Sequence, residues 1–172
     1  MTELSQWVMD TSAFTHFCRA GYSHILAALA PQAVVLVPRE VEIEIENGRE
    51  HHVGIPLLHE VAWAARIFMT DDEEWTATQV KAALGGGTEE NLGESAVIAC
   101  ARHRGLVAVL DDRAAAEQAR RLGVQSINTM KIVAEAHRRV FNGDQNQTIA
   151  LVDALLATEM RLPVKSGAEL FA

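Results

Sequence analysis

Short apolar runs alternate along the chain with longer segments whose apolar residues recur at helical spacing. The clearest run is residues 33–37, Ala-Val-Val-Leu-Val, which lies between Pro31 and Pro38. A continuous β-branched run of this kind is typical of a strand that is buried on both faces of a parallel sheet. The expected strands are residues 6–9, 33–37, 66–69, 106–110 and 124–127.

Helical patterns fill most of the chain between these strands. Residues 70–73, Thr-Asp-Asp-Glu, form a capping-box pattern that opens a helix ending at the glycines 85–87. The other expected helices are residues 14–18, 25–30, 91–104, 113–122, 132–141 and 149–160. This alternation predicts an α/β fold, with three α/β/α layers around a mostly parallel central sheet of four to five strands. Because the polar loop 142–148 is too short to divide domains, we expect residues 1–172 to form a single domain.

Residues 41–46, Val-Glu-Ile-Glu-Ile-Glu, fit two kinds of structure. Their strict alternation matches a half-buried strand. A helix is also consistent, with Pro38 in its first turn, acidic residues after it and Gly48 beyond its end. We predict the helix, partly because the family resemblance given below requires it.

The composition narrows the expected environment of the protein. The formal net charge is −8, which is unusual for a protein that holds phosphates by surface charge alone. An acidic protein that handles phosphates needs other cations, and a bound divalent metal would supply them. No apolar run approaches the roughly 20 residues of a membrane span, and the first eight residues do not resemble a secretory signal. Cys18 and Cys100 lie among apolar neighbours, so we expect buried free thiols in a reducing cytoplasm.

Acidic residues follow two of the expected strands and begin two helical segments. Asp10 ends the first strand, and Asp111 and Asp112 follow the strand 106–110. Glu94 falls in the first turn of one helix, and Glu44 lies in the segment after Pro38. The carboxyl ends of parallel strands share one edge of the sheet, so these carboxylates could converge there. Converging carboxylates repel one another unless they are protonated or bridged by a cation, and Mg²⁺ or Mn²⁺ suits such oxygen ligands.

Each of these residues also has a structural interpretation. Asp10 and Asp112 precede helices and could be ordinary N-caps. Glu94 stands three residues after Asn91, at capping-box spacing. Glu44 belongs to a row of alternating glutamates that could form a solvated face, and Glu40 or Glu42 competes with it as the second acidic ligand.

Other polar groups are less specific. His51, His52 and His59 lack helical metal-ligand spacing and are expected in an exposed loop. The basic side chains of the second half could line a nucleic-acid track, although solvated helix faces explain them more simply. These residues are Arg102, Arg104, Arg113, Arg120, Arg121, Lys131, Arg138 and Arg139.

Four short blocks, in order, resemble the conserved blocks of the PIN domain family. They are residues 8–13 (Val-Met-Asp-Thr-Ser-Ala), 37–44 followed by Gly48, 92–98 (Leu-Gly-Glu-Ser-Ala-Val-Ile) and 109–115 (Val-Leu-Asp-Asp-Arg-Ala-Ala). The resemblance implies a Mg²⁺- or Mn²⁺-dependent endoribonuclease that cleaves single-stranded RNA, as in VapC-type toxins of toxin–antitoxin pairs. It further implies an antitoxin partner and a homodimer. The implied metal ligands are Asp10, Glu44, Glu94 and Asp112, supported by Thr11, Ser12 and Asp111.

Two further classes of function are compatible with the sequence. One is a catalytically inactive PIN-like module that binds RNA or a protein, which the retention of all four acidic positions disfavours. The other is a phospho-acceptor receiver domain, whose acidic pair usually follows the first strand. Here the pair at 111 and 112 comes late, and Lys131 is not followed by proline. The ribonuclease is therefore our leading hypothesis.

Overall fold

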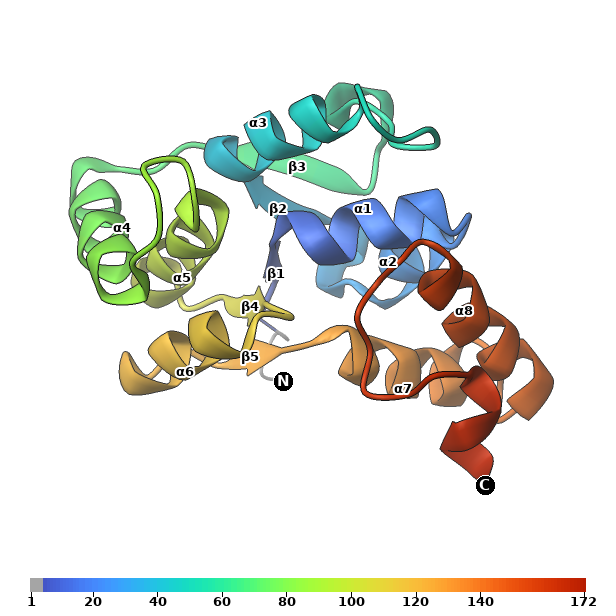
Figure 1. Cartoon of the computed structure of the whole chain (residues 1–172). Coiled ribbons are helices and arrows are strands. Elements are labelled where there is room, and N and C mark those ends of the chain that lie inside the picture. The colour runs from blue at the N-terminus through green and yellow to red at the C-terminus, as the bar shows by residue number, and fades with distance from the viewer. Residues whose placement is uncertain (1–4) are drawn as a thin grey trace.

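Five parallel strands form the centre of the protein, in a computed structural model that describes residues 5–172 (Figure 1). The strands are β1 (Trp7–Met9), β2 (Val35–Pro38), β3 (Ala64–Ile67), β4 (Val107–Val109) and β5 (Ser126–Ile127). Their order across the sheet is β3-β2-β1-β4-β5, and every neighbouring pair is parallel. The expected α/β class, with a central sheet of four to five strands, is confirmed.

Helices cover both faces of this sheet. They are α1 (Thr11–Arg19), α2 (Ser23–Leu29), α3 (Arg39–Gly48), α4 (Asp71–Leu84), α5 (Leu92–Arg104), α6 (Arg113–Arg121), α7 (Thr129–Arg139) and α8 (Gln145–Ala157). Figure 1 shows α4, α5 and α6 on one side of the strands and α1, α2, α7 and α8 on the other. Helix α3 follows β2 and packs against both α1 and α5. No helix of residues 5–172 has the length and apolar character that crossing a membrane requires.

The strand order places a topological switch next to β1. The chain first moves outward from β1 to β2 and β3, and then returns to place β4 on the other side of β1. Trp7, Val8 and Met9 pair with Val107, Ala108 and Val109, all of which are buried. In open parallel sheets the crevice beyond the carboxyl ends at such a switch is the usual ligand site. Asp10 directly follows β1, and Asp111 follows β4 after one intervening residue.

Most expected elements are present, with shifted ends. The ambiguous segment 41–46 is helical, as predicted, but Pro38 is the last residue of β2 and Gly48 lies inside α3 rather than beyond it. The expected strand 33–37 begins only at Val35, because Pro31–Ala33 forms a 3-10 turn in which Gln32 has a φ of 59°. Strand β5 is shorter than the predicted 124–127.

Two later helices begin three or four residues earlier than their apolar pattern suggested. Asn128 caps α7 by accepting a hydrogen bond from the Lys131 N–H, and Asp144 caps α8 in the same way from Gln147. The apolar spacing detects the buried middle of a helix, whereas the cap determines its first residue. The predicted capping box at Thr70 is confirmed, with Glu73 and Thr70 bonded reciprocally.

Both cysteines are buried and unpaired, as expected. Burial raises the pKa of each thiol to about 12, so the reactive thiolate is disfavoured at neutral pH.

Candidate active site

Asp10 occupies the junction of β1 and α1. It is the N-cap of α1, and its Oδ1 accepts the Thr11 N–H at 2.6 Å. Its own N–H donates to the Val109 carbonyl, which fixes its backbone against the end of β4. Only 4% of the residue is exposed. The expected capping role is therefore present, but a buried acid needs more than one N–H to offset its lost hydration.

Asp111 and Asp112 follow β4 but have different partners. The two oxygens of Asp111 accept hydrogen bonds from the N–H and the hydroxyl of Thr129, both at 2.8 Å, so this carboxylate ties the end of β4 to the start of α7. Asp112 is the N-cap of α6, and its Oδ1 accepts the Ala115 N–H at 2.8 Å. The predicted cap at Asp112 is confirmed, and its second oxygen has no hydrogen-bond partner among residues 5–172.

Glu44 reaches from α3 to the starts of two other helices. One of its oxygens accepts the Thr11 hydroxyl, and the other accepts the Gly93 N–H at 3.1 Å. A Cβ on residue 93 would lie 2.7 and 2.9 Å from the two carboxylate oxygens. Glycine is thus required at 93 for Glu44 to approach the first turn of α5 this closely. Thr11, expected as a supporting residue, contacts Glu44, whereas Ser12 makes no side-chain hydrogen bond in the described part of the chain.

Glu94 lies in the first turn of α5, as predicted, but without a capping box. Asn91 is in the left-handed region with a φ of 60°, and its side chain does not cap the helix. It donates instead to the Gly85 carbonyl, while its own carbonyl accepts the Ser95 hydroxyl. The structural interpretation of Glu94 as half of a capping box is wrong. Its backbone N–H partly offsets the rise that burial causes in the pKa of its carboxyl.

The charges that raise the pKa values of Asp10 and Glu94 indicate which of the acids are neighbours. Burial is the largest cause that raises the pKa of Asp10 well above its ordinary value, and the charges of Glu94, Glu44 and Asp111 raise it further against the Thr11 N–H. Burial also raises the pKa of Glu94, with additional contributions from Glu44 and Asp112. Five carboxyls from four segments therefore share one region, and we call this set the acidic cluster. Its members are Asp10, Glu44, Glu94, Asp111 and Asp112.

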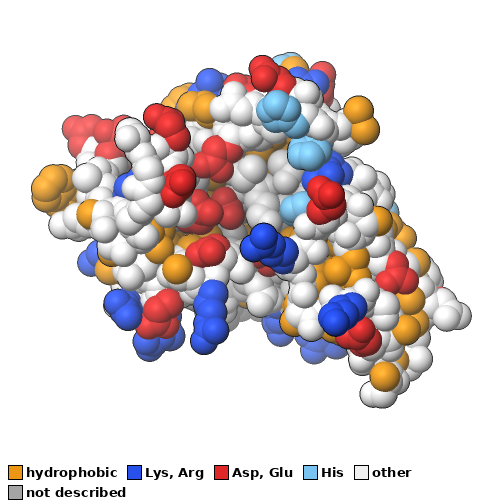
Figure 2. Space-filling view, in the orientation of Figure 1, with side chains coloured by type: hydrophobic (Ala, Val, Ile, Leu, Met, Phe, Trp, Pro, Cys, Tyr) orange, Lys and Arg blue, Asp and Glu red, His pale blue; other side chains and the backbone are white. Residues whose placement is uncertain are grey.

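Figure 2 shows acidic side chains gathered in a hollow near the centre of the molecule, between α5 and the start of α1. In this view, histidine side chains lie above and to the right of the hollow, and Lys or Arg side chains lie to its right and below it. Among residues 5–172, none of the acidic cluster forms an ion pair with a Lys, Arg or His side chain. The negative charge of the cluster is thus not compensated by the protein itself.

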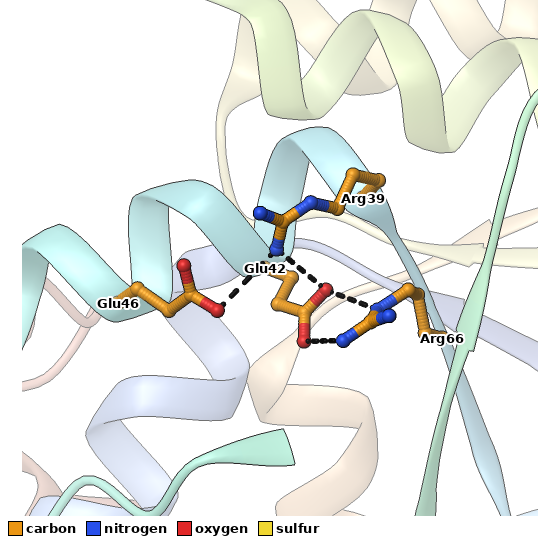
Figure 3. A network of polar contacts seen from close by, with 4 residues as sticks. All are labelled: Arg39, Glu42, Glu46 and Arg66. Atoms are coloured by element: carbon orange, nitrogen blue, oxygen red, sulfur yellow. Dashed lines mark hydrogen bonds and ion pairs between the residues drawn. The ribbon is translucent and has the colours of Figure 1, made fainter. Parts of the chain in front are cut away.

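The two competing glutamates of α3 lie outside the cluster. Glu42 is 2% exposed and accepts hydrogen bonds from Arg39 and Arg66, and Arg39 also pairs with Glu46 (Figure 3). These bonds lower the pKa of Glu42, the Arg66 bond most of all. Glu40 has one buried oxygen without a hydrogen-bond partner in the described chain. Its charge contributes to the raised pKa of Cys100 and is not among the causes of the raised pKa of Asp10.

The other polar groups singled out in the sequence have ordinary surroundings. His51, His52 and His59 are exposed, as expected. Most of the basic residues pair with nearby acids: Arg104 with Glu73, Arg120 and Arg121 with Glu117, and Lys131 and Arg138 with Glu135. Arg102, Arg113 and Arg139 form no ion pair among residues 5–172, and Arg113 lines a cavity of about 560 Å³ beside Asp111.

The donor set of the acidic cluster fits a hard divalent cation. Asp10 Oδ2, the Glu94 carboxyl and Asp112 Oδ2 are the oxygens with the fewest protein partners. Such oxygens suit Mg²⁺ or Mn²⁺. Burial, and then the neighbouring acids, raise the pKa of Asp10 and of Glu94, as expected where no cation balances these carboxyls. Within residues 5–172, however, no three His, Cys, Asp or Glu side chains are already grouped closely enough to hold an ion. Binding would therefore draw these side chains inward.

Sequence reasoning did not identify the groups that hold the acids in place. Gly93 and Thr129 act through backbone N–H groups and through contacts 49 and 18 residues away in the chain. The Gly-Glu pair at 93 and 94 is visible in the third block, but its contact with Glu44 requires the folded arrangement of α3 and α5.

The sequence matches the model of a known family. A family model described as a PIN domain matches residues 6–171, which is almost the whole chain. No curated protein matches the sequence significantly.

Proposed function

The chain belongs to the PIN domain family, whose members are typically nucleases that use divalent metals and act on RNA, and we propose that it is an endoribonuclease of single-stranded RNA dependent on Mg²⁺ or Mn²⁺. The observation that carries this proposal is the uncompensated acidic cluster at the carboxyl ends of β1 and β4. Like charges in a buried site are unfavourable unless a cation or protons balance them. A cation there would recover that cost and attract a phosphodiester.

The acids of the cluster would have different roles, because their hydrogen-bond partners differ. A bound Mg²⁺ or Mn²⁺ would activate a water and neutralise charge on the phosphodiester. Asp10, Glu94 and Asp112 offer the least engaged oxygens as ligands. Glu44 is oriented by Thr11 and Gly93, and Asp111 by Thr129, so these two would act with little reorganisation. No side chain of the cluster is a thiol or an amine, and the proposed reaction is hydrolysis without a covalent enzyme intermediate.

Cleavage assays test the proposal directly. Purified protein with millimolar Mg²⁺ or Mn²⁺ should cut single-stranded RNA, and excess chelator should stop it. Asp10→Asn keeps an acceptor for the Thr11 N–H but removes the buried charge, and should lower the rate at least about 100-fold. Glu42→Gln, which also removes a buried carboxylate, is the matched control and should retain the rate. Cleavage that persists in chelator would refute the metal mechanism.

An inactive module remains the main alternative. Binding of RNA without cleavage of any of several unrelated sequences, in either metal, would favour it over the enzyme.

We further propose the context that the resemblance implies, a toxin with a cognate antitoxin, acting as a homodimer in the cytoplasm. Two buried, unpaired cysteines are in keeping with a reducing compartment. Ile43, Phe68 and Trp75 are exposed large hydrophobic side chains that a second copy would cover. A small neighbouring reading frame with a DNA-binding N-terminus, whose product neutralises the RNA cleavage, would support the toxin role. A monomer at micromolar concentration by light scattering would contradict the homodimer.

A further inference from the structure

A cavity of about 340 Å³ opens beside the acidic cluster and is lined by one of its members, Glu44, and by Thr11, which donates to Glu44. The volume falls within the roughly 300–1,000 Å³ range of small-molecule sites. Its wall is formed by α1, the end of α3, the loop after α3 and the segment after α8, and it includes Thr15, His16, Arg19, His52 and Glu159. We call this cavity the α1 pocket. A group bound there would lie next to whatever the acidic cluster binds.

The α1 pocket offers positive charge in a protein whose net charge is −8. Arg19 is half-buried, and among residues 5–172 it is in no ion pair, whereas most of the other arginines named above are bound to nearby acids. Unpaired arginine in a pocket is suited to a phosphate, which it can bind through two parallel hydrogen bonds. Glu44 and Glu159 also line the pocket, and their carboxylates would repel a phosphate that is not bound by Arg19.

The hydrogen bonds of His16 assign its tautomer. Its Nδ1 lies 2.7 Å from the Thr158 hydroxyl, which itself donates to the Leu155 carbonyl at 2.6 Å. The hydroxyl therefore accepts from the ring, and Nδ1 carries the proton. Burial lowers the pKa of His16, and Arg19 and His52 lower it further against the opposing charge of Asp111. The neutral ring leaves Nε2 as a hydrogen-bond acceptor, which calls for a donor from a ligand.

We propose that the α1 pocket binds one ribonucleotide of the substrate strand next to the cleaved bond, with Arg19 on its phosphate and His16 Nε2 accepting its 2′-hydroxyl. The proposal rests on the ribonuclease function proposed above and adds how the strand is positioned and how RNA is distinguished from DNA. The 2′-hydroxyl is the group that DNA lacks, so an acceptor without a protein donor favours RNA.

The phosphate contact is tested by binding in excess chelator, where cleavage does not interfere. A labelled single-stranded RNA of about ten nucleotides is titrated with wild type, Arg19→Ala and Arg102→Ala. Arg102 is an exposed arginine at the end of α5, beside a cavity at the amino-end edge of the sheet, and is the matched control for lost charge. Arg19→Ala should weaken binding about tenfold and reduce the slope of log affinity against log salt by about 0.7, as for one lost phosphate contact. Equal affinities and slopes for the two variants would overturn the assignment.

The sugar contact is tested with DNA of the same sequence. His16→Asn retains an N–H near the place of Nδ1 for Thr158 and removes Nε2. Wild type should prefer RNA, and His16→Asn should lose most of that preference by weakening RNA binding while DNA binding stays constant. A parallel loss for both nucleic acids would refute the 2′-hydroxyl contact. Thermal unfolding of each variant confirms that it is folded.

The two proposals fail in different ways. If wild type cleaves RNA but Arg19→Ala binds and cleaves as Arg102→Ala does, the pocket assignment is wrong and the nuclease stands. If no RNA is cleaved in any metal but Arg19→Ala still weakens RNA binding, the pocket stands and the nuclease is wrong. With an active enzyme, Arg19→Ala should raise KM and leave kcat nearly unchanged, because Arg19 contacts a nucleotide outside the reacting bond.

Discussion

Two groups of buried acidic residues in this protein have opposite electrostatic properties. Glu42 and Glu73 are 2% and 1% exposed, and each is bound by arginine: Arg39 and Arg66 hold the first, and Arg104 holds the second. Hydrogen bonds from these arginines are the largest causes that lower the pKa of both acids. Asp10 is buried to a similar extent, at 4% exposed, but burial and neighbouring acids raise its pKa.

The difference separates structure from function within one fold. A buried carboxylate with arginine partners is satisfied, and it fixes elements against each other, as Glu42 fixes α3 against β3 (Figure 3). A buried carboxylate among other carboxylates is unfavourable for folding and persists only if it does something else. Residue type alone would not distinguish Glu42 from Glu44, which are two residues apart on one helix. Their burial and their partners do, since Glu42 is buried between arginines and Glu44 is half-buried against Thr11 and Gly93.

The largest expected effect is the difference between Glu44→Gln and Glu42→Gln in RNA cleavage and in stability. Glu44→Gln removes a charge from the acidic cluster and should lower RNA cleavage at least about 100-fold, with a stability change below about 0.5 kcal/mol because Gln still accepts from Thr11 or Gly93. Glu42→Gln should do the reverse: cleavage within about twofold of wild type, and a loss of about 1.5 kcal/mol, at the low end for charged hydrogen bonds because the arginines are partly solvated.

Initial rates with saturating metal and urea unfolding midpoints measure both halves of this ranking. If Glu42→Gln were the variant that loses cleavage, α3 would have a different register in the active protein, and the comparison would fail. Arg66→Gln sharpens the result, since it should resemble Glu42→Gln in stability while leaving cleavage intact.

A smaller effect concerns Asp112, which both caps α6 and adds to the charge around Glu94. Asp112→Asn preserves the cap, because Asn is an equally good N-cap. In chelator the variant should be as stable as wild type or slightly more stable, since one repulsion is removed. Metal at ten times its Kd should stabilise wild type by about 1.4 kcal/mol, and the variant should gain less at the same concentration.

Thermal unfolding of wild type and Asp112→Asn, each in chelator and in metal, provides the four measurements. Equal metal-induced shifts would show that Asp112 is only a cap. Asp144→Asn, at the cap of α8 and outside the acidic cluster, is the control and should change the metal-induced shift by nothing measurable.

The sequence was sufficient for most of the fold because the strands are short, apolar and bounded by clear breakers. Pro38, the acids after it and the family resemblance together favoured a helix for α3, despite an alternation that also matched a strand. The ends of α7 and α8 were missed because Asn128 and Asp144 initiate them from polar segments without an apolar pattern.

The positions of the acids were predictable, but their partners were not. Asp10 and Asp111 follow neighbouring strands, and the topology alone brings their backbones to the same edge. That Arg66, from β3, would bind Glu42, or that Thr129 would bind Asp111, depends on contacts 24 and 18 residues apart that leave no local pattern. The role proposed for Arg19 had no sequence signal, since it depends on a pocket formed by distant segments and on the lack of an ion pair for Arg19 among residues 5–172.

The smallest expected effect is on how the stability of the metal-free protein depends on pH. The pKa values of Asp10 and Glu94 are raised in the folded protein, from ordinary values of 3.8 and 4.5. Protonation of these two carboxyls therefore contributes to the free energy of unfolding fully below the ordinary values, and this contribution is lost as the pH rises through the raised pKa values. Glu42 and Glu73 have lowered pKa values, and their contribution is present above pH 4.5 and lost as pH falls.

In chelator, wild type should therefore lose stability from about pH 5 upward. The loss should be less than about 1.4 kcal/mol per pH unit, because Asp10 and Glu94 titrate as a pair. Asp10→Asn removes the repulsion, so its curve should be flatter over this range and lie above that of wild type near pH 8. Saturating metal should flatten the wild-type curve in the same way, since the ion replaces the protons. Below about pH 4 the two proteins should lose stability in parallel, because the arginine-bound glutamates are common to both. Urea unfolding across this pH range decides the matter, and parallel curves above pH 5 would mean that Asp10 and Glu94 are not under repulsion in the folded protein.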